Sequence, residues 1–226
     1  MKGRLIVFEG ADGSGKATQA ALLKEALAAR GERVRSVTFP NYESPAAGPV
    51  RMYLAGEFGA HPDDVSPYAA SALYAVDRYA SYKSDWGAFY EAGGTIVADR
   101  YVTSNMVHQM TKLRSAKEKR EFLQWLDAFE YGTLELPRPD LVILLDIPRD
   151  VSETLLAART QNKDQAAQAT DIHEADREYL ARCYAAYDLL APHYGWVRIR
   201  CTDGDRLLTV EEIHAKVLAC VTGKCK

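Results

Sequence analysis

The chain has 226 residues, of which 47% are hydrophobic and 26% are charged, and its formal net charge at pH 7 is −3. This length fits one α/β domain, or at most two small ones, and is sufficient to bury a substantial core. The slightly acidic balance argues against a general binder of nucleic acids or membrane surfaces, so any site for an anion has to be built from local residues.

Five short apolar runs predict β-strands along the chain, and segments with helical patterns lie between them. Hydrophobicity within the runs is continuous, which is typical of strands that are buried on both faces of a parallel sheet. Strands separated by helices imply right-handed crossovers and therefore an α/β fold with a parallel sheet flanked by helices. The predicted strands are residues 4–9, 33–39, 94–99, 140–146 and 195–201, and the predicted helices include residues 16–30, 65–91, 116–129 and 171–191.

The N-terminal residues and the cysteines near the C-terminus indicate the cellular compartment and the redox state that we expect for the protein. The N-terminal apolar run, LIVF, is too short for a signal peptide or a membrane span, so we expect a soluble, cytoplasmic protein. All four cysteines lie in the last quarter of the chain and form no C-x-x-C pair. Neither a zinc site nor a disulfide framework is expected, and reduced thiols are the simpler interpretation.

The segment FEGADGSGKATQ, residues 8–19, nearly matches a Walker A phosphate loop, G-x-x-x-x-G-K-[ST], between the first predicted strand and the first predicted helix. Its glycines let successive backbone N–H groups turn inward toward an anion, the helix adds the positive end of its dipole, and Lys16 adds a full charge. We predict that this loop binds nucleotide phosphates. The loop residues are Gly10, Ala11, Asp12, Gly13, Ser14, Gly15, Lys16, Ala17 and Thr18.

Ala17 departs from the motif, because a hydroxyl normally reaches the Mg²⁺ ion from this position. Thr18 cannot replace it, since one helical step rotates the side chain by roughly 100°. Thr18 is better placed to bond an α-phosphate oxygen. Mg²⁺ keeps several waters and binds through one or two carboxylates plus substrate phosphates, so the sequence should supply an acid near the loop.

Such an acid follows the third predicted strand, in VADRYVTSNMVHQ, residues 97–109. In an open parallel sheet, the residues beyond the carboxyl ends of the strands line the ligand crevice. Asp99 is therefore the predicted metal site, and the planar guanidinium of Arg100 suits bidentate binding of a phosphate. The alternative is that Asp99 and Arg100 form a surface pair that caps the following helix.

Six segments of the chain, taken together, resemble the thymidylate kinase family: GADGSGKAT, FPNY, ALYAVDR, DRYVTSN, LPRPDLVILLD and DIHEADREYL. They occur in the order and spacing of that family, from the first predicted strand into the helix that ends near Ala191. The resemblance implies a P-loop three-layer fold with a five-stranded parallel sheet, in a single domain that spans residues 1–226 with a lid segment at about residues 159–170. It also implies a homodimer.

The same resemblance implies a phosphotransferase that moves the γ-phosphate of ATP to the 5′-phosphate of dTMP, giving dTDP and ADP, with Mg²⁺. Members of the family without a hydroxyl at the position of Ala17 exist, so we interpret the loop as a working site. Lys16, Asp99 and Arg100 would then take part in catalysis. Asp12 matches the family's acid that bonds the 3′-hydroxyl of the substrate or a bound water.

Two pairs of side chains with helical spacing are predicted to bind the acceptor nucleotide. Tyr74 and Arg78 share one helix face, so the ring can stack on a base while the guanidinium bonds a carbonyl at the base edge. The alternative is a surface Tyr–Arg pair. Asn105 and Gln109 share a face of the next helix, where Asn105 can bond the base edge and Gln109 can approach the ribose or base.

The segment FPNY follows the second predicted strand. Phe39, Pro40 and Tyr42 are predicted to wall the deoxyribose and base, although an aromatic residue at a strand end also packs commonly into the core. His108 stands where many relatives carry a tyrosine. Because the acceptor phosphate is already ionised near neutral pH, no general base is needed, and we interpret His108 as a pocket wall or a surface residue.

The phosphate loop contains no arginine, so a further cation for the transferring group has to come from elsewhere. Arg159 is the nearest candidate and Lys163 the next, in the polar stretch at residues 159–170, which is either a solvated connection or a mobile lid. Both can instead be a basic helix terminus that the helix dipole favours. Asp171 and Glu174 resemble lid acids, but capping a helix is the simpler role for Asp171, and that of Glu174 stays open.

Two other functions stay open at this point. One is a related deoxynucleoside or nucleoside-monophosphate kinase with another base preference. The other is a non-catalytic P-loop protein that binds a nucleotide as a switch or scaffold. A switch needs no second nucleotide pocket, so the predicted acceptor-binding residues argue against it.

Overall fold

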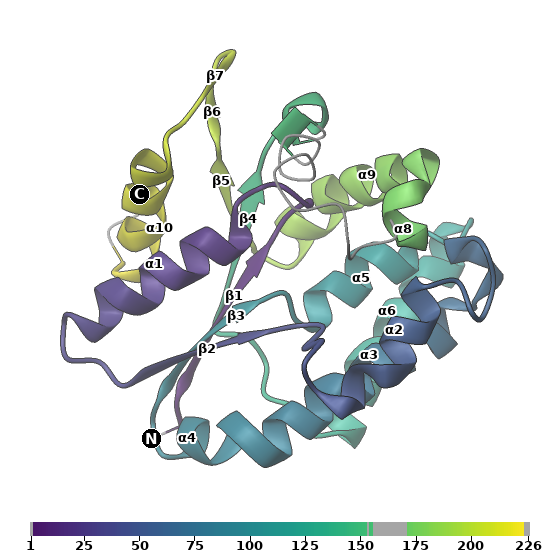
Figure 1. The fold of residues 1–226 in the computed structure, drawn as a ribbon, viewed down its shortest axis with the longest axis horizontal. Coiled ribbons are helices and arrows are strands. Elements are labelled where there is room, and N and C mark those ends of the chain that lie inside the picture. The colour runs from purple at the N-terminus through teal and green to yellow at the C-terminus, as the bar shows by residue number, and fades with distance from the viewer. Residues whose placement is uncertain (1, 153, 156–170, 224–226) are drawn as a thin grey trace.

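The computed structural model describes residues 2–152, 154–155 and 171–223, and its centre is a five-stranded parallel sheet (Figure 1). The strands follow the order β2-β3-β1-β4-β5. Each of the five lies inside one of the predicted runs, so the prediction of a five-stranded parallel sheet is confirmed. They are β1 (Arg4–Glu9), β2 (Val34–Thr38), β3 (Thr95–Asp99), β4 (Leu141–Asp146) and β5 (Val197–Arg200).

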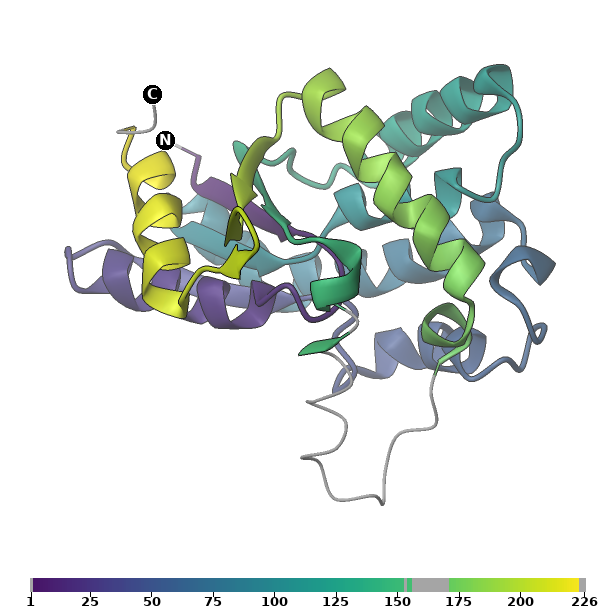
Figure 2. The ribbon, with the colours of Figure 1, turned by 90° about the horizontal axis from the view of Figure 1, so that it is seen from above.

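Helices cover both faces of this sheet and give the molecule three layers. Figure 2 shows α1 and α10 together on one side of the sheet and the other large helices on the opposite side. The helices are α1 (Lys16–Ala28), α2 (Gly48–Leu54), α3 (Pro67–Ser81), α4 (Gly87–Glu91), α5 (Val102–Met110), α6 (Ala116–Asp127), α8 (Ile172–Ala175), α9 (Arg177–His193) and α10 (Val210–Val221).

Alternate residues of the central strand β1 belong to two different hydrophobic clusters. Leu5 and Val7 pack with residues of α5, α6 and α9, whereas Ile6 and Phe8 pack with residues of α1 and α10. Both faces of the strand are therefore buried, which is why its hydrophobicity does not alternate.

The helix that we predicted at residues 65–91 is interrupted by a π-helical turn, Tyr82–Trp86, between α3 and α4. This turn requires a glycine after it, since a Cβ at Gly87 would lie 2.4 Å from the carbonyl oxygen of Tyr82. A second π-helical turn, Ala128–Thr133, follows α6. The hydrophobic pattern of a π-helical turn does not differ enough from that of an α-helix to be recognised beforehand.

The predicted helix at residues 171–191 is divided at Asp176 into α8 and α9. Asp176 has non-helical angles (φ −100°, ψ 94°), and its side chain accepts a hydrogen bond from the backbone N–H of Tyr179, so that it caps α9. Helix α10 is not among the predicted helices, although a capping box at Thr209 and Glu212 precedes its apolar residues. The hairpin of β6 (Thr202–Asp203) and β7 (Arg206–Leu207) was not predicted either.

Cys183 and Cys201 are free thiols in the protein interior. Cys220 is disulfide-bonded, so the expectation of reduced thiols is wrong for this residue. In the described part of the chain, no helix combines the length and the apolar character that crossing a membrane requires.

Candidate active site

The phosphate loop lies between β1 and α1, as predicted. Gly10, Gly13 and Gly15 all adopt positive φ values (143°, 83° and 86°), which side chains other than glycine rarely tolerate. A Cβ at Gly10 would also lie 2.7 Å from the carbonyl oxygen of Leu145, so the space beside β4 excludes any side chain there. The loop conformation therefore depends on these glycines.

Lys16 begins α1 and is buried against its own loop. Its Nζ donates to the carbonyl oxygens of Gly10 (2.9 Å) and Ala11 (2.8 Å) and lies 3.6 Å from Oδ1 of Asp12. Burial and the nearby charge of Arg100 lower the pKa of Lys16, while Asp12 opposes them. The ammonium group is thus held at the loop by two backbone carbonyl oxygens.

Arg100 brings the end of β3 into contact with the loop. Its Nη2 donates to Oδ1 of Asp12 at 2.6 Å, and its backbone has a left-handed conformation with φ 66°. Burial alone would raise the pKa of Asp12, but the charges of Arg100 and Lys16 outweigh burial and hold this pKa well below its usual range. The surface pair of Asp99 and Arg100 that we considered does not form; Arg100 pairs with the loop instead.

Glu9 is a site residue that the analysis of the sequence missed. It is fully buried at the end of β1 and accepts hydrogen bonds from the hydroxyls of Thr103 and Ser104, both at 2.7 Å. Burial raises the pKa of Glu9, while Arg100 and the two hydroxyls oppose that rise. An acid at the end of an otherwise apolar strand, directly before the first glycine of the loop, is the signal that was overlooked.

Asp99 and Glu9 fit the requirements of a magnesium site. Oδ1 of Asp99 and Oε2 of Glu9 are buried and have no hydrogen-bond donor among the described residues. No group of three acidic, histidine or cysteine side chains in that part of the chain forms a ready-made metal cluster. Mg²⁺ takes only one or two protein carboxylates and completes its shell with water and substrate phosphates, so these two oxygens could hold it.

The side chain of Arg78 is 2% exposed and forms a buried ion pair with Glu130, a residue of the second π-helical turn. Nε of Arg78 donates to Oε2 at 2.8 Å, and Nη2 donates to Oε1. Glu130 raises the pKa of Arg78 against the effect of burial. Nδ2 of Asn105 donates to the same carboxylate at 3.2 Å and to the carbonyl of Ser71 at 3.2 Å. The structure therefore brings Arg78 and Asn105 together through Glu130.

The other predicted acceptor residues are more scattered. Tyr74 is partly buried, and its ring meets that of Tyr53 edge to face at 6.3 Å. Phe39 lies in the core against Tyr101, which is the alternative that we considered for it. The ring of Tyr42 is half exposed, and Pro40 follows Phe39 through a cis peptide bond.

Gln109 is fully buried, and neither atom of its amide has a hydrogen-bond partner among the described residues. Buried amides are rarely left unpaired, because desolvation without a hydrogen bond costs free energy. A polar ligand or water is the natural partner of this side chain.

His108 is partly buried and does not lie on the free surface. Its ring stacks on that of His173 from α8, with a centroid distance of 5.7 Å and an interplanar angle of 10°. Asp171 accepts hydrogen bonds from the backbone N–H groups of His173 and Glu174, both at 2.8 Å, so its predicted capping role is confirmed. Arg159 and Lys163 lie outside the described residues.

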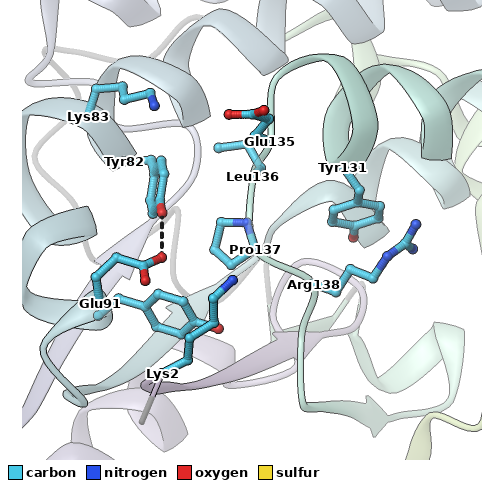
Figure 3. A pocket seen from close by; sticks show the side chains of 10 residues that line it. Lys2, Tyr82, Lys83, Glu91, Tyr131, Glu135, Leu136, Pro137 and Arg138 are labelled. Carbon is cyan, nitrogen blue, oxygen red and sulfur yellow. Dashed lines mark hydrogen bonds between the residues drawn. The ribbon is translucent and has the colours of Figure 1, made fainter.

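Two of the cavities among the described residues differ in their relation to the phosphate loop. The larger, of about 610 Å³, is lined by ten residues, among them Lys2, Tyr82, Tyr131 and Arg138, and we predicted none of the ten as a site residue (Figure 3). The smaller, of about 170 Å³, touches the phosphate loop at Ala11 and is also lined by Tyr187.

A family model described as "Thymidylate kinase" matches residues 8–190. This segment contains the phosphate loop, the end of β3 and all of the predicted acceptor residues. The chain belongs to the thymidylate kinase family. The family assignment agrees with the six sequence segments from which we expected it.

Curated members of the family align over most of this chain. A thymidylate kinase of Leifsonia xyli subsp. xyli is 33% identical over 224 residues, which are 98% of this chain and 96% of the relative. A thymidylate kinase of Mycobacterium tuberculosis is 32% identical over 193 residues, 85% of this chain and 87% of the relative. A probable thymidylate kinase of Pyrococcus abyssi is 29% identical over 221 residues, 98% of this chain and 97% of the relative.

A solved structure shares the fold. The structure of thymidylate kinase from Candida albicans superposes with a TM-score of 0.69 and covers 98% of this chain and 92% of its own. Since the two sequences are only 18% identical, this likeness establishes the P-loop α/β architecture and not the details of the site.

Proposed function

We propose that this protein is a thymidylate kinase that transfers the γ-phosphate of ATP to the 5′-phosphate of dTMP, giving dTDP and ADP. The observation that carries the proposal is the contact between the phosphate loop and the end of β3. Arg100 bonds Oδ1 of Asp12 at 2.6 Å, and Lys16 lies 3.6 Å from the same oxygen. Two cations, one at the start of α1 and one directly after β3, thus lie close to the same carboxylate oxygen, as transfer between two phosphates requires.

The chemistry that we propose depends on positioning and neutralisation of charge. The backbone N–H groups of the loop and the N-terminus of α1 would hold the phosphates of ATP, with the ammonium of Lys16 turned onto them. Arg100 would bind the phosphate of dTMP, and Asp12 its 3′-hydroxyl or a bound water. No side chain has to remove a proton, since the acceptor oxygens are ionised near neutral pH.

Mg²⁺ would neutralise charge on the phosphate oxygens when it is bound with ATP. Asp99 and Glu9 would hold the ion or its waters through Oδ1 and Oε2, which accept no hydrogen bond from the described residues. Arg159 is our candidate for a further cation at the transferring group, in a lid at about residues 159–170. We further propose a homodimer in the cytoplasm, with the whole chain as one kinase domain.

Acceptor recognition would fall to the helices beside the sheet. Arg78 and Asn105 are joined through Glu130, and these buried hydrogen bonds would hold the remaining donors of Arg78 and Asn105 in fixed directions. A guanidinium only donates, so it suits the O4 carbonyl of thymine and not the amino group of cytosine. Tyr74 would stack on the base.

A coupled assay of ADP release over a panel of acceptors tests this proposal. We expect the highest kcat/KM for dTMP among dTMP, dUMP, dCMP, AMP and thymidine. A higher value for another monophosphate or for thymidine would assign the protein to a different kinase activity. ADP release that does not depend on any acceptor would instead indicate a nucleotide-binding protein that is not a small-molecule kinase.

A further inference from the structure

The side chain of Arg100 is 15% exposed, and its guanidinium uses three of its five N–H donors in hydrogen bonds with described residues. Nη2 donates to Oδ1 of Asp12 at 2.6 Å, and Nη1 donates to Oγ of Ser104 at 3.3 Å and to Nε2 of His108 at 3.4 Å. The donor on Nε and the second donor on Nη2 have no acceptor among the described residues. These two donors form the edge of the guanidinium group that is available to bind a phosphate.

The contact with Arg100 fixes the tautomer of His108. Because a guanidinium only donates, Nε2 has to be an unprotonated acceptor, and the hydrogen of the neutral ring has to be on Nδ1. Nδ1 lies 3.5 Å from Sγ of Cys183, a distance at which the thiol sulfur accepts a weak hydrogen bond. Both ring nitrogens are thus occupied in one consistent arrangement.

The electrostatic surroundings keep the ring neutral. Burial, followed by the positive charge of Arg100, lowers the pKa of His108 to about 3. Asp12 acts in the opposite direction, whereas Lys16 and Lys112 act in the same direction as Arg100. An imidazolium would turn an N–H toward the guanidinium, which has no acceptor to offer.

Three further contacts hold the ring in place. The ring of His173 stacks on it at 5.7 Å, and Nε2 of His173 is itself hydrogen-bonded to the hydroxyl of Tyr53 at 2.8 Å. The backbone carbonyl of His108 accepts hydrogen bonds from the hydroxyls of Tyr179 and Thr111, both at 2.9 Å. The stacking, the hydrogen bonds to the backbone carbonyl and the contact of Nδ1 with Cys183 together restrain the imidazole. A restrained ring can fix the direction of the hydrogen bond between Nε2 and Arg100.

We propose that His108 is a positioning residue: in its neutral, Nδ1-protonated form it accepts a hydrogen bond from Nη1 of Arg100 and so directs the two remaining donors of Arg100 toward the acceptor phosphate. Cys183 and His173 support His108 in this role. This inference rests on the proposed function only in that Arg100 binds the acceptor phosphate. It goes beyond our expectation that His108 is a pocket wall or a surface residue.

The first test uses the free protein and needs no activity. ¹⁵N NMR of the histidine side chains, assigned with His108→Gln, should show Nδ1 of His108 protonated and Nε2 unprotonated, with no titration between pH 5 and pH 8. A proton on Nε2, or a titration near the ordinary histidine pKa of about 6.5, would overturn the proposal. Neither result depends on which nucleotide the enzyme phosphorylates.

The second test is kinetic. His108→Phe removes the acceptor but keeps a ring that can stack, and we expect kcat/KM for dTMP to fall about tenfold to a hundredfold, as for the loss of a hydrogen bond to a charged group. KM for ATP and the melting temperature should change little. His108→Gln, whose Oε1 takes the place of Nε2, should restore most of the loss, and His193→Phe on the exposed end of α9 is the matched control.

Equal kcat/KM in wild type and His108→Phe would overturn the positioning role while leaving the thymidylate kinase activity intact. A parallel loss for ATP, or a large fall in melting temperature that Gln does not reverse, would assign His108 to the core alone. Failure of the wild-type protein to phosphorylate dTMP would instead contradict the proposed function, with the NMR result unaffected.

Discussion

Asp99 takes on greater importance at the metal site because Ala17 offers no hydroxyl there. We expect Asp99→Asn to lower kcat about tenfold or more and to raise the Mg²⁺ concentration required for half-maximal rate. Ala17→Ser is the matched comparison, and it should change both quantities far less. Rates are measured against Mg²⁺ concentration at saturating ATP; near-normal turnover of Asp99→Asn would remove this residue from the metal site.

Arg78 can either read the base or only stabilise the fold through its ion pair with Glu130. A double variant of the pair separates these two roles. Arg78→Ala alone would leave a buried carboxylate unpaired, so the change is better made together with Glu130→Gln, as Arg78→Met/Glu130→Gln. If Arg78 reads the base, the ratio of kcat/KM for dTMP to that for dCMP should fall about tenfold in the double variant, while KM for ATP stays constant. An unchanged ratio would mean that the pair is structural only.

Glu130 itself should contribute mainly to stability. Glu130→Gln leaves the guanidinium of Arg78 buried without a counter-charge, and we expect it to lower the free energy of unfolding by about 3–5 kcal/mol. Urea denaturation with Glu135→Gln as the control measures this effect, since Glu135 follows the same π-helical turn. A loss below about 1 kcal/mol would show that the pair is not desolvated in solution.

At the scale of single residues, the sequence predicted those that belong to a local pattern. The phosphate loop, Asp99 and Arg100 could be found because a motif and the end of a strand mark them. Glu130 could not, since its partner Arg78 is 52 positions away and no spacing links the two. The contact between Arg100 and His108 spans a strand end and a helix and emerges only when both are in place.

Helix α10 allows a prediction about pH at the scale of an element. Hydrogen bonding with Arg206, followed by the backbone N–H of Thr209, lowers the pKa of Glu212 to about 2. A lowered folded-state pKa contributes stability that is present above the unfolded-state pKa of about 4.3 and is lost as the pH falls toward 2. Glu212→Gln should therefore lower the melting temperature at pH 7 but have little effect at pH 2.

Glu211→Gln is the control for this prediction, because Glu211 is an exposed acid in the same first turn. Thermal unfolding of the two variants and the wild type between pH 2 and pH 7 makes the measurement. A difference between wild type and Glu212→Gln that stays constant over this range would contradict the assigned pKa.

The elements that the sequence predicted well are the strands. Burial on both faces leaves uniform apolar runs in β1, β3 and β4, whereas the edge strands β2 and β5 are mostly exposed or partly buried. Boundaries inside the helices were harder. The π-helical turn at Tyr82–Trp86 keeps the periodic pattern of its neighbours, and the break at Asp176 depends on a single cap in the middle of a helical pattern. Tertiary packing, and not local preference, decides such interruptions.

The exposed apolar side chains of α3 indicate where the proposed homodimer forms its interface. Tyr68, Val76 and Tyr79 are 39%, 52% and 39% exposed, and exposed apolar groups gathered on one helix are typical of an interface. We expect the proposed homodimer to bury this helix, so Val76→Glu should shift the protein toward the monomer. The control is Val210→Glu on α10, which lies on the other side of the sheet.

Light scattering coupled to size-exclusion chromatography measures the mass of each variant. A dimer that persists in Val76→Glu would place the interface elsewhere, and a monomeric wild type at micromolar concentration would contradict the homodimer itself.

The central claim for the whole molecule is that the γ-phosphate of ATP ends on dTMP. Its most direct test is to incubate the protein with dTMP and with ATP whose γ-phosphate carries ¹⁸O, and to analyse the products by mass spectrometry and ³¹P NMR. We predict dTDP with the label in its β-phosphate, together with an equal amount of unlabelled ADP. Labelled inorganic phosphate with unchanged dTMP would contradict the account.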